Sequence, residues 1–219
     1  MLGSLSFLSM NFSKNITAIQ KMLELPLPGE EAQYLLAPKE RKSKLEYLAD
    51  NSNPRLSSVL ILLYPGEQGE LKTVFIQRPI NKSVHSGQIA FPGGKFDESD
   101  SDLSATALRE THEEIGVNPV DIDVIGALSD LYIPASNFLV HPFVGKLEFT
   151  PEFIPNPDEV KSILPATLEE ILSFETGHMP FKTAYGNLIA PYFKFQEHAM
   201  WGATAMIVSE FREIMKRVF

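Results

Sequence analysis

The sequence predicts an α+β fold in which a mixed β-sheet lies between α-helices. Apolar, partly β-branched runs of strand length occur along much of the chain, and apolar residues at helical spacing mark its two ends. These strand and helix signals do not alternate regularly, which disfavours a parallel sheet built from repeated strand–helix units. Because 44% of the 219 residues are apolar, the chain can bury the core of one domain.

The N-terminal part is predicted to be helical at first and less regular afterwards. Apolar residues recur at helical spacing in residues 11–25, and the Pro-Leu-Pro-Gly sequence at 26–29 ends that helix. Residues 30–53 are charged and mixed, so we expect them to be irregular or partly helical. We therefore treat residues 1–50 as a helical or irregular extension of a single domain that spans residues 1–219.

The next segment predicts a β-hairpin. Residues 57–64 and 71–78 are apolar runs separated by a Pro-Gly-Glu-Gln-Gly-Glu sequence, which is typical of a longer hairpin loop. Residues 88–91 follow as a short strand, and we expect Pro92-Gly93-Gly94 to form a loop after it.

A helix is predicted at residues 102–115, which contain no glycine or proline. Gly116 then stands where a C-terminal helix cap belongs. Two further strands, at 120–131 and 138–148, are expected around a loop at 134–137.

The C-terminal part completes the mixture of strands and helices. Residues 160–164 and 188–195 are predicted strands, and residues 167–174 form a predicted short helix between them. Apolar residues of the last segment, 207–218, fall on one helical face, so we expect a helix that packs on the core.

Composition excludes several classes of function. The chain has no cysteine, which excludes disulfides, a thiol nucleophile and cysteine-ligated metals. The formal net charge of -9 disfavours a nucleic-acid-binding surface, which needs clustered Lys and Arg. No run approaches the ~20 apolar residues of a membrane-spanning helix, and no basic residue precedes the first apolar run. We therefore expect a cytoplasmic protein that binds neither membranes nor nucleic acids.

Three carboxylates on the predicted central helix point to a metal site. Because each helical residue turns by ~100°, Glu110, Glu113 and Glu114 fall within an arc of about 100°. Like charges so placed repel one another, and the negative end of the helix dipole disfavours them further. Bound Mg²⁺ or Mn²⁺ would remove this conflict, since hard cations prefer oxygen ligands. Arg109 lies one turn before Glu113 and can orient one carboxylate.

The two glycines at the predicted loop supply a second part of such a site. Gly93 and Gly94 let the backbone approach a ligand closely, so the loop can offer a carbonyl to a metal or an N–H group to a phosphate. Metal ions stabilise charge on phosphoryl oxygens and lower the pKa of an attacking water, whose proton a nearby carboxylate can accept. The alternative at this stage is a solvated acidic helix.

Residues Gly94 and Arg109–Val117 resemble the Nudix box of the Nudix hydrolases, G-x5-E-x7-R-E-U-x-E-E-x-G-U with U aliphatic. The second stretch matches at every fixed position except Thr111, which stands where U is usual. Upstream, Ser101 stands where the pattern has Glu, and Gly94 is one residue further away than the pattern asks. The open candidates for the missing carboxylate are Glu98, Asp100 and Asp102.

The segment before the box is similar to the coenzyme A pyrophosphatase subgroup of this family. The match includes the Phe-Pro-Gly-Gly sequence at 91–94, together with Arg78 and Gly87 at the subgroup's spacing. Ser83 stands where the subgroup has a second Arg, although Lys82 is adjacent. The resemblance implies the Nudix fold and hydrolysis of coenzyme A or its thioesters to adenosine 3′,5′-bisphosphate and a phosphopantetheine.

The resemblance also implies roles for individual residues, with Mg²⁺ or Mn²⁺ as cofactor. The implied metal ligands are Glu110, Glu113, Glu114 and the Gly94 carbonyl. The implied catalytic residues are Glu110 and Glu113, one of which serves as base, and Arg109, which orients the carboxylates. The candidate substrate-binding residues are Arg78, Lys82, His85, Gly87 and Gly93.

Two rival functions stay open. The missing cation at Ser83 allows another nucleoside diphosphate substrate, such as ADP-ribose or NADH, and a Nudix-fold module that senses a nucleotide without turnover is a third reading. In each case the partner is a small nucleotide, and a homodimer is left open. We expect His112 to be an exposed helix residue. The aromatic residues expected in the core, with adenine stacking as the alternative, are Tyr192, Phe193, Phe195 and Trp201.

Overall fold

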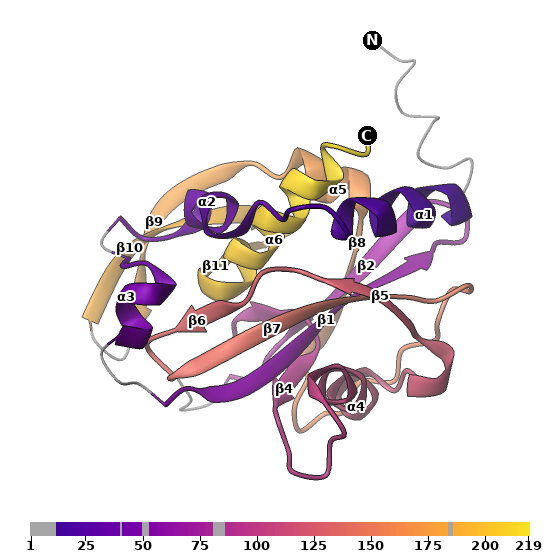
Figure 1. Ribbon diagram of the computed structural model, residues 1–219, viewed down its shortest axis with the longest axis horizontal. Coiled ribbons are helices and arrows are strands. Elements are labelled where there is room, and N and C mark those ends of the chain that lie inside the picture. Colours follow the sequence, from indigo (N-terminus) through magenta and orange to yellow (C-terminus); the bar gives the residue numbers. More distant parts are fainter. Residues whose placement is uncertain (1–11, 40, 50–52, 81–85, 184–185) are drawn as a thin grey trace.

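The computed structural model describes residues 12–39, 41–49, 53–80, 86–183 and 186–219. A large mixed sheet forms its centre, with helices on both faces (Figure 1). The predicted arrangement of a mixed sheet between helices is therefore confirmed. None of the helices in the described ranges is long and apolar enough to cross a membrane.

The main sheet has eight strands, and β1 and β7 form its parallel pair. Its strands are β1 (Arg55–Pro65), β2 (Leu71–Gln77), β3 (Ile89–Ala90), β4 (Gly93–Lys95), β5 (Asp123–Ala127), β6 (Leu131–Ile133), β7 (Phe138–Lys146) and β8 (Ser162–Thr167). The order is β3-β2-β1-β7-β5, while β4 also pairs with β1, β6 with β7 and β8 with β2. All pairs except β1–β7 are antiparallel.

Helices cover the two faces of this sheet unequally. They are α1 (Phe12–Leu23), α2 (Gly29–Gln33), α3 (Lys44–Ala49), α4 (Leu103–Ile115), α5 (Leu168–Ser173) and α6 (Gly202–Met215), with short 3-10 turns η1 (Tyr34–Leu36) and η2 (Pro119–Asp121). Helix α4 lies on one face, and α1, α2 and α6 lie on the other (Figure 1). A smaller sheet beside α6 contains β9 (Thr176–Thr183), β10 (Gly186–Phe195) and β11 (His198–Trp201), in the order β11-β10-β9.

Strand β1 is buried on both faces, which explains its continuous apolar sequence. Leu60 and Leu62 belong to the hydrophobic cluster beneath α4. The alternate residues Ile61 and Leu63 belong to the larger cluster on the α6 side. The strand that carries the site is thus fixed by packing from both sides.

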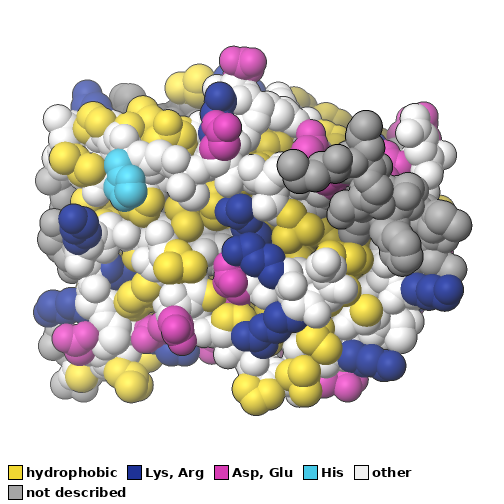
Figure 2. Space-filling model, turned by 90° about the horizontal axis from the view of Figure 1, so that it is seen from above, with side chains coloured by type: hydrophobic (Ala, Val, Ile, Leu, Met, Phe, Trp, Pro, Cys, Tyr) yellow, Lys and Arg dark blue, Asp and Glu magenta, His cyan; other side chains and the backbone are white. Residues whose placement is uncertain are grey.

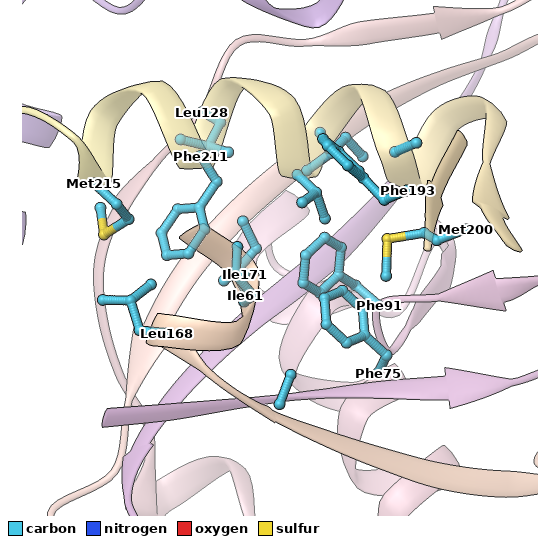
Figure 3. Packing of buried hydrophobic residues seen from close by; sticks show 14 of the residues in the cluster. Ile61, Phe75, Phe91, Leu128, Leu168, Ile171, Phe193, Met200, Phe211 and Met215 are labelled. Atoms are coloured by element: carbon cyan, nitrogen blue, oxygen red, sulfur yellow. The ribbon is translucent and has the colours of Figure 1, made fainter. Parts of the chain in front are cut away.

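The larger cluster also fixes the start of β4. Phe91 is 1% exposed, and its ring centroid lies 4.6 Å from that of Phe75 on β2. Phe211 of α6 belongs to the same cluster (Figure 3). Since Phe91 precedes Gly93 by two residues, this packing holds the glycine pair in place against β1.

Several predicted elements are confirmed by the structure. The hairpin forms with Tyr64 opposite Lys72, and the predicted helix at 102–115 is α4. The segment at 30–53 is partly helical through α2 and α3. Phe193 and Phe195 are core residues, 1% and 2% exposed.

Two sequence predictions need correction, and two strands were missed. The predicted loop at 92–94 is wrong for its glycines, because Gly93 and Gly94 belong to β4 and pair with Val59 and Ser58 of β1. The single strand predicted at 120–131 is divided into η2, β5 and β6. Strands β9 and β11 were not predicted, because β9 contains a glycine and a proline and both strands form by pairing with β10.

A buried carboxylate ties the N-terminal segment to α6. The side chain of Glu210 is completely buried and accepts hydrogen bonds from Gly29 N at 3.0 Å and from Gln33 Nε2 at 2.8 Å. The backbone N–H of Ser129 is a third donor, at 3.3 Å. These donors satisfy a buried charge, so α2 is held firmly against α6.

Figure 2 shows the molecule from above the view of Figure 1. On this face the described Lys and Arg, Asp and Glu, and hydrophobic side chains are interspersed (Figure 2). The face therefore presents a mixed surface rather than one extended patch of a single charge.

Candidate active site

Helix α4 carries the central residues of the site, and both of its ends are capped. Asp102 accepts a hydrogen bond from Ala105 N at 2.9 Å, as an N-cap residue does. At the other end Gly116 has a φ of 77°, and its N–H group donates to His112 O at 2.9 Å. The left-handed conformation favours glycine at this position. The caps fix the length of the helix and so the position of its carboxylates.

His112 is exposed, as predicted.

Glu114 is the most deeply buried of the three carboxylates. It is 1% exposed, and its Oε2 accepts a hydrogen bond from Gly93 N at 2.8 Å. Arg78 Nη1 lies 3.7 Å from its Oε1. Burial is the main cause that raises the pKa of Glu114 to about 8, while Arg78 and the Gly93 N–H act in the opposite direction. The charged form is thus only partly compensated by the protein.

Glu110 lies one turn earlier and contacts the second glycine of β4. A Cβ atom added at Gly94 would lie 2.3 Å from the carboxyl carbon of Glu110, so only glycine leaves room for this carboxylate. The pKa of Glu110 is raised, chiefly by burial, and Arg109 opposes this shift. The charge of Glu159, from the loop before β8, raises the pKa of both Glu110 and Glu114.

Arg109 joins the carboxylates of α4 to the loop before the helix. Its Nη1 donates to Glu110 Oε1 at 2.9 Å and to Glu113 Oε2 at 3.0 Å. The pairing with Glu113 one turn away is the one that the sequence predicted. On its other side Arg109 contacts both oxygens of Asp100, with Nε to Oδ1 at 2.8 Å and Nη2 to Oδ2 at 3.0 Å. Arg109 is therefore placed to orient three carboxylates.

Asp100 is the carboxylate that sequence reasoning left undecided. Its side chain is 4% exposed, and Arg109 holds the pKa of Asp100 well below its ordinary value. Asp102 is engaged as the helix cap, and Glu98 is exposed. Counting forward from Gly94 over five residues finds Asp100, so the extra residue of this chain lies between Asp100 and Arg109.

Thr111 stands at the one irregular position of the helical motif. It is completely buried, and its hydroxyl donates to Ala107 O at 2.7 Å, one turn back. The hydroxyl is therefore satisfied locally, and the side chain packs where an aliphatic residue is usual.

A pocket of about 730 Å³ opens beside the glycine pair. Its apolar walls come from β1, β3, β7, β10, the loop after β6 and the start of α6. The charged residues on its walls are Arg41, Arg78 and Lys95, and no carboxylate of the described residues lines it. In a chain of net charge -9, this lining favours an anionic ligand with an apolar part.

The N-terminal segment and the only tryptophan of the chain also contribute to this pocket. Pro38, Arg41 and Tyr47 line it, so the segment before β1 forms part of the pocket wall. Trp201 lines it as well, and its ring stacks on that of Phe181 with centroids 4.2 Å apart.

The donor set fits a divalent cation, although the carboxylates are turned toward protein partners. No three carboxylate or imidazole groups within the described part of the chain converge closely enough to hold a cation as they stand. Arg109 holds Glu110 and Glu113, while Gly93 holds Glu114. The buried, incompletely compensated Glu114 is nevertheless the kind of oxygen ligand that Mg²⁺ or Mn²⁺ would stabilise in its charged form.

The predicted substrate-binding residues differ in their placement. Arg78 lines the pocket and donates from Nη2 to Gly93 O at 3.1 Å. The N–H group of Gly87 donates to Pro79 O at 3.1 Å, and Gly87 is not among the residues lining the pocket. The predictions for Lys82 and His85 lie outside the described residues, as does Ser83.

Comparisons with known proteins find a matching family model and similar proteins. The NUDIX domain family model matches residues 54–184. Nudix hydrolase 15, mitochondrial, from Arabidopsis thaliana is 34% identical over 73% of this chain, which spans 58% of that relative's length. Nudix hydrolase 22, chloroplastic, from the same plant is 33% identical over 91% of this chain and 73% of its own. The crystal structure of a MutT/nudix family protein from Enterococcus faecalis, 18% identical, matches 86% of this chain and 73% of its own with a TM-score of 0.48.

Proposed function

This chain belongs to the Nudix family, and we propose that it is a diphosphatase that splits coenzyme A or an acyl-coenzyme A with Mg²⁺ or Mn²⁺ as cofactor. The products would be adenosine 3′,5′-bisphosphate and phosphopantetheine or its acyl form. Nudix hydrolases generally depend on divalent metals and act on nucleoside diphosphate derivatives. The lining of the pocket supports coenzyme A as the substrate among those derivatives.

The observation that carries the reaction is the contact between two carboxylates of α4 and the glycine pair of β4. Glu114 accepts the N–H of Gly93, and Glu110 occupies the space that a side chain at Gly94 would need. We assign the metal to Glu110, Glu114 and the Gly94 carbonyl, and we leave Glu113, the third implied ligand, for the role of base. A cation bound there would offset charge on the phosphoryl oxygens and lower the pKa of the attacking water.

The proton of the attacking water needs an acceptor at the surface of the site. The Glu113 side chain is 46% exposed, against 15% for Glu110, and it is held by Arg109 alone among the described residues. We assign Glu113 as the base and Arg109 as the residue that orients it. A general base contributes typically ~10²–10⁴-fold, so Glu113→Gln is expected to lower kcat by that order. Full kcat in this variant would transfer the role to Glu110.

The pocket supports a substrate with a long, weakly polar arm. Arg78 stands between Glu114 and the pocket, where it can bind a phosphate of the diphosphate. Beyond it the walls are mainly apolar, as suits the pantetheine arm of coenzyme A. The second ribose of ADP-ribose, or the ribose and nicotinamide of NADH, would bring polar groups against the same walls.

A direct assay tests both the reaction and the substrate. Purified protein would be given coenzyme A, acetyl-coenzyme A, ADP-ribose and NADH with either Mg²⁺ or Mn²⁺, and the products separated by chromatography. We expect the highest kcat/KM for a coenzyme A compound. A preference for ADP-ribose or NADH would contradict the proposed substrate, and binding without any turnover would indicate a nucleotide-sensing module instead. The cytoplasmic location stays a prediction, which cell fractionation would test. The homodimer also stays a prediction, which light scattering would test.

A further inference from the structure

Arg41 is a pocket residue that the family pattern does not contain. It comes from the N-terminal segment, and its guanidinium lies 5.5 Å from the ring centroid of Tyr34 and 5.9 Å from that of Tyr47. Its Nη2 donates to the carbonyl oxygen of Tyr132, 91 residues away in the sequence. The aromatic rings and this hydrogen bond hold the side chain at the wall of the pocket.

The guanidinium of Arg41 is incompletely paired. Its Nε is buried and has no hydrogen-bond partner, and no carboxylate among the described residues lies within ion-pair distance of it. A buried donor left unpaired costs about 1–3 kcal/mol, so a native structure that retains one needs a reason.

Unpaired polar atoms gather around this pocket. Ser58 Oγ and Ser136 Oγ are also buried without a partner, and both residues line the pocket together with Arg41. Of the six such atoms in the described part of the chain, three therefore belong to pocket residues. Ser136 follows β6, the strand whose Tyr132 carbonyl Arg41 holds, whereas Ser58 pairs with Gly94 at the Arg78 end of the pocket. The wall near Arg41 therefore holds two buried polar atoms without a protein partner, Arg41 Nε and Ser136 Oγ.

Arg41 lies apart from the end of the pocket where Arg78 stands. Arg41 holds the carbonyl of Tyr132 on β6, whereas Arg78 holds the carbonyl of Gly93 on β4. Between these strands lie β7 and β1, so the two carbonyls are three strand spacings, or ~14 Å, apart across the sheet. One cation therefore stands beside the carboxylate helix and the other stands well away from it.

We propose that Arg41 binds a second anionic group of the substrate, carried at a distance from the diphosphate that is hydrolysed. This inference rests on the proposed function, because it assigns the diphosphate to the Arg78 end of the pocket. The group is a phosphate monoester or a carboxylate, since the planar guanidinium fork matches the oxygens of either. In a coenzyme A compound the first source is the 3′-phosphate, and the second is a carboxylate at the end of the acyl chain.

The single tryptophan provides a binding signal that does not depend on turnover. Trp201 lines the same pocket, so its fluorescence is expected to change when a ligand enters. Two ligand pairs separate the two sources in buffer with EDTA and no added metal. Adenosine 3′,5′-bisphosphate and adenosine 5′-monophosphate differ by the 3′-phosphate, while succinyl- and butyryl-coenzyme A differ at the end of the acyl chain by a carboxylate.

Three variants complete the design. Arg41→Gln removes the cation, Arg41→Lys keeps the charge without the planar fork, and Arg217→Gln removes an exposed charge that does not line the pocket. In one of the two pairs, we expect the wild-type protein and Arg217→Gln to favour the ligand with the additional anionic group by ~10-fold or more, the strength of a hydrogen bond to a charged group. Arg41→Gln should reduce that ratio to about one, with Arg41→Lys between them.

The results decide the proposal and identify the group. If the affinity ratio of the first pair depends on Arg41, the bound group is the 3′-phosphate. If the affinity ratio of the second pair depends on Arg41, the bound group is the acyl-chain carboxylate. Equal ratios in the wild-type protein and Arg41→Gln, or no discrimination by the wild-type protein, overturn the inference. If Arg41→Gln does not fold by circular dichroism, the comparison is made with Arg41→Lys. Absence of turnover with metal alongside an Arg41-dependent ratio would contradict the proposed hydrolase and not this binding site.

Discussion

Replacing Gly94 by alanine separates the position of one carboxylate from the stability of the fold. The added Cβ would lie 2.3 Å from the carboxyl carbon of Glu110 and 2.4 and 2.5 Å from its two oxygens. All three atoms are at the far end of a flexible side chain, and they can move aside. The backbone of Gly94 need not change, so the strain falls on the carboxylate alone.

The magnitude follows from this overlap. Non-bonded carbon atoms approach to about 3.5 Å, so the Glu110 carboxyl group must retreat by about 1 Å. A misplacement of this size in a catalytic site costs about 10²-fold in rate. We therefore expect Gly94→Ala to lower kcat by ~100-fold while its melting temperature stays within about 4 °C of the wild type.

Gly93→Ala is the matched control. At this position φ is +149°, and the new Cβ would lie 2.3 Å from Ser58 O and 2.6 Å from Val59 Cα, which are backbone atoms that cannot move aside. Overpacking of this kind costs typically 1–3 kcal/mol, so its melting temperature should fall by about 5 °C or more. The assays are steady-state turnover of the preferred substrate and thermal unfolding followed by circular dichroism. A folded Gly94→Ala protein with wild-type kcat would refute the role assigned to the Glu110 carboxylate.

Three further variants test other parts of the site. In protein kept metal-free with a chelator, the Glu114 carboxyl ionises near its ordinary pKa of 4.5 in the unfolded chain and near a pKa of about 8 in the folded protein. The stability that is present below pH 4.5 is therefore lost as the pH rises through about 8. Glu114→Gln should flatten this fall in melting temperature and abolish metal-dependent turnover. Asp100→Asn removes a partner of Arg109 and should lower the melting temperature by about 3–8 °C, together with kcat, whereas an unchanged calorimetric transition would show that the pair adds nothing. Thr111→Val is expected to keep kcat and to change stability by no more than about 1 kcal/mol in urea titrations, because the hydroxyl makes a single local hydrogen bond, to Ala107 O. A larger loss would indicate a further partner.

Features set by neighbouring residues were predictable from the sequence. Helix α4 was found because its ends are marked by Asp102 and Gly116, and capping depends on residues within one turn. The pairing of Arg109 with Glu113 follows from helical geometry in the same way. Strand β1 was found because burial on both faces leaves a continuous apolar run.

Features set by distant contacts were not predictable from the sequence. Asp100 reaches Arg109 through a loop, and a pattern counted backwards from the helix points to Ser101 instead. Gly93 and Gly94 have the composition of a loop, but their pairing with β1 makes them a strand. Arg41 carries no local signal, because its place in the pocket depends on β6 and on two tyrosine rings.

The hydrogen bonds of the Glu210 carboxylate connect two regions that lie outside the span of the NUDIX domain model. The pattern covers residues 54–184, yet the donors Gly29 and Gln33 precede it and Glu210 follows it. A protein trimmed to that span would keep α4 and lose α6, and it would also lose Pro38, Arg41 and Tyr47 from the pocket wall. A protein trimmed at its N-terminus alone would leave a buried anion short of two donors. Engineering of substrate choice in this chain therefore has to exchange the two flanking regions together, because they share the buried hydrogen bonds of Glu210.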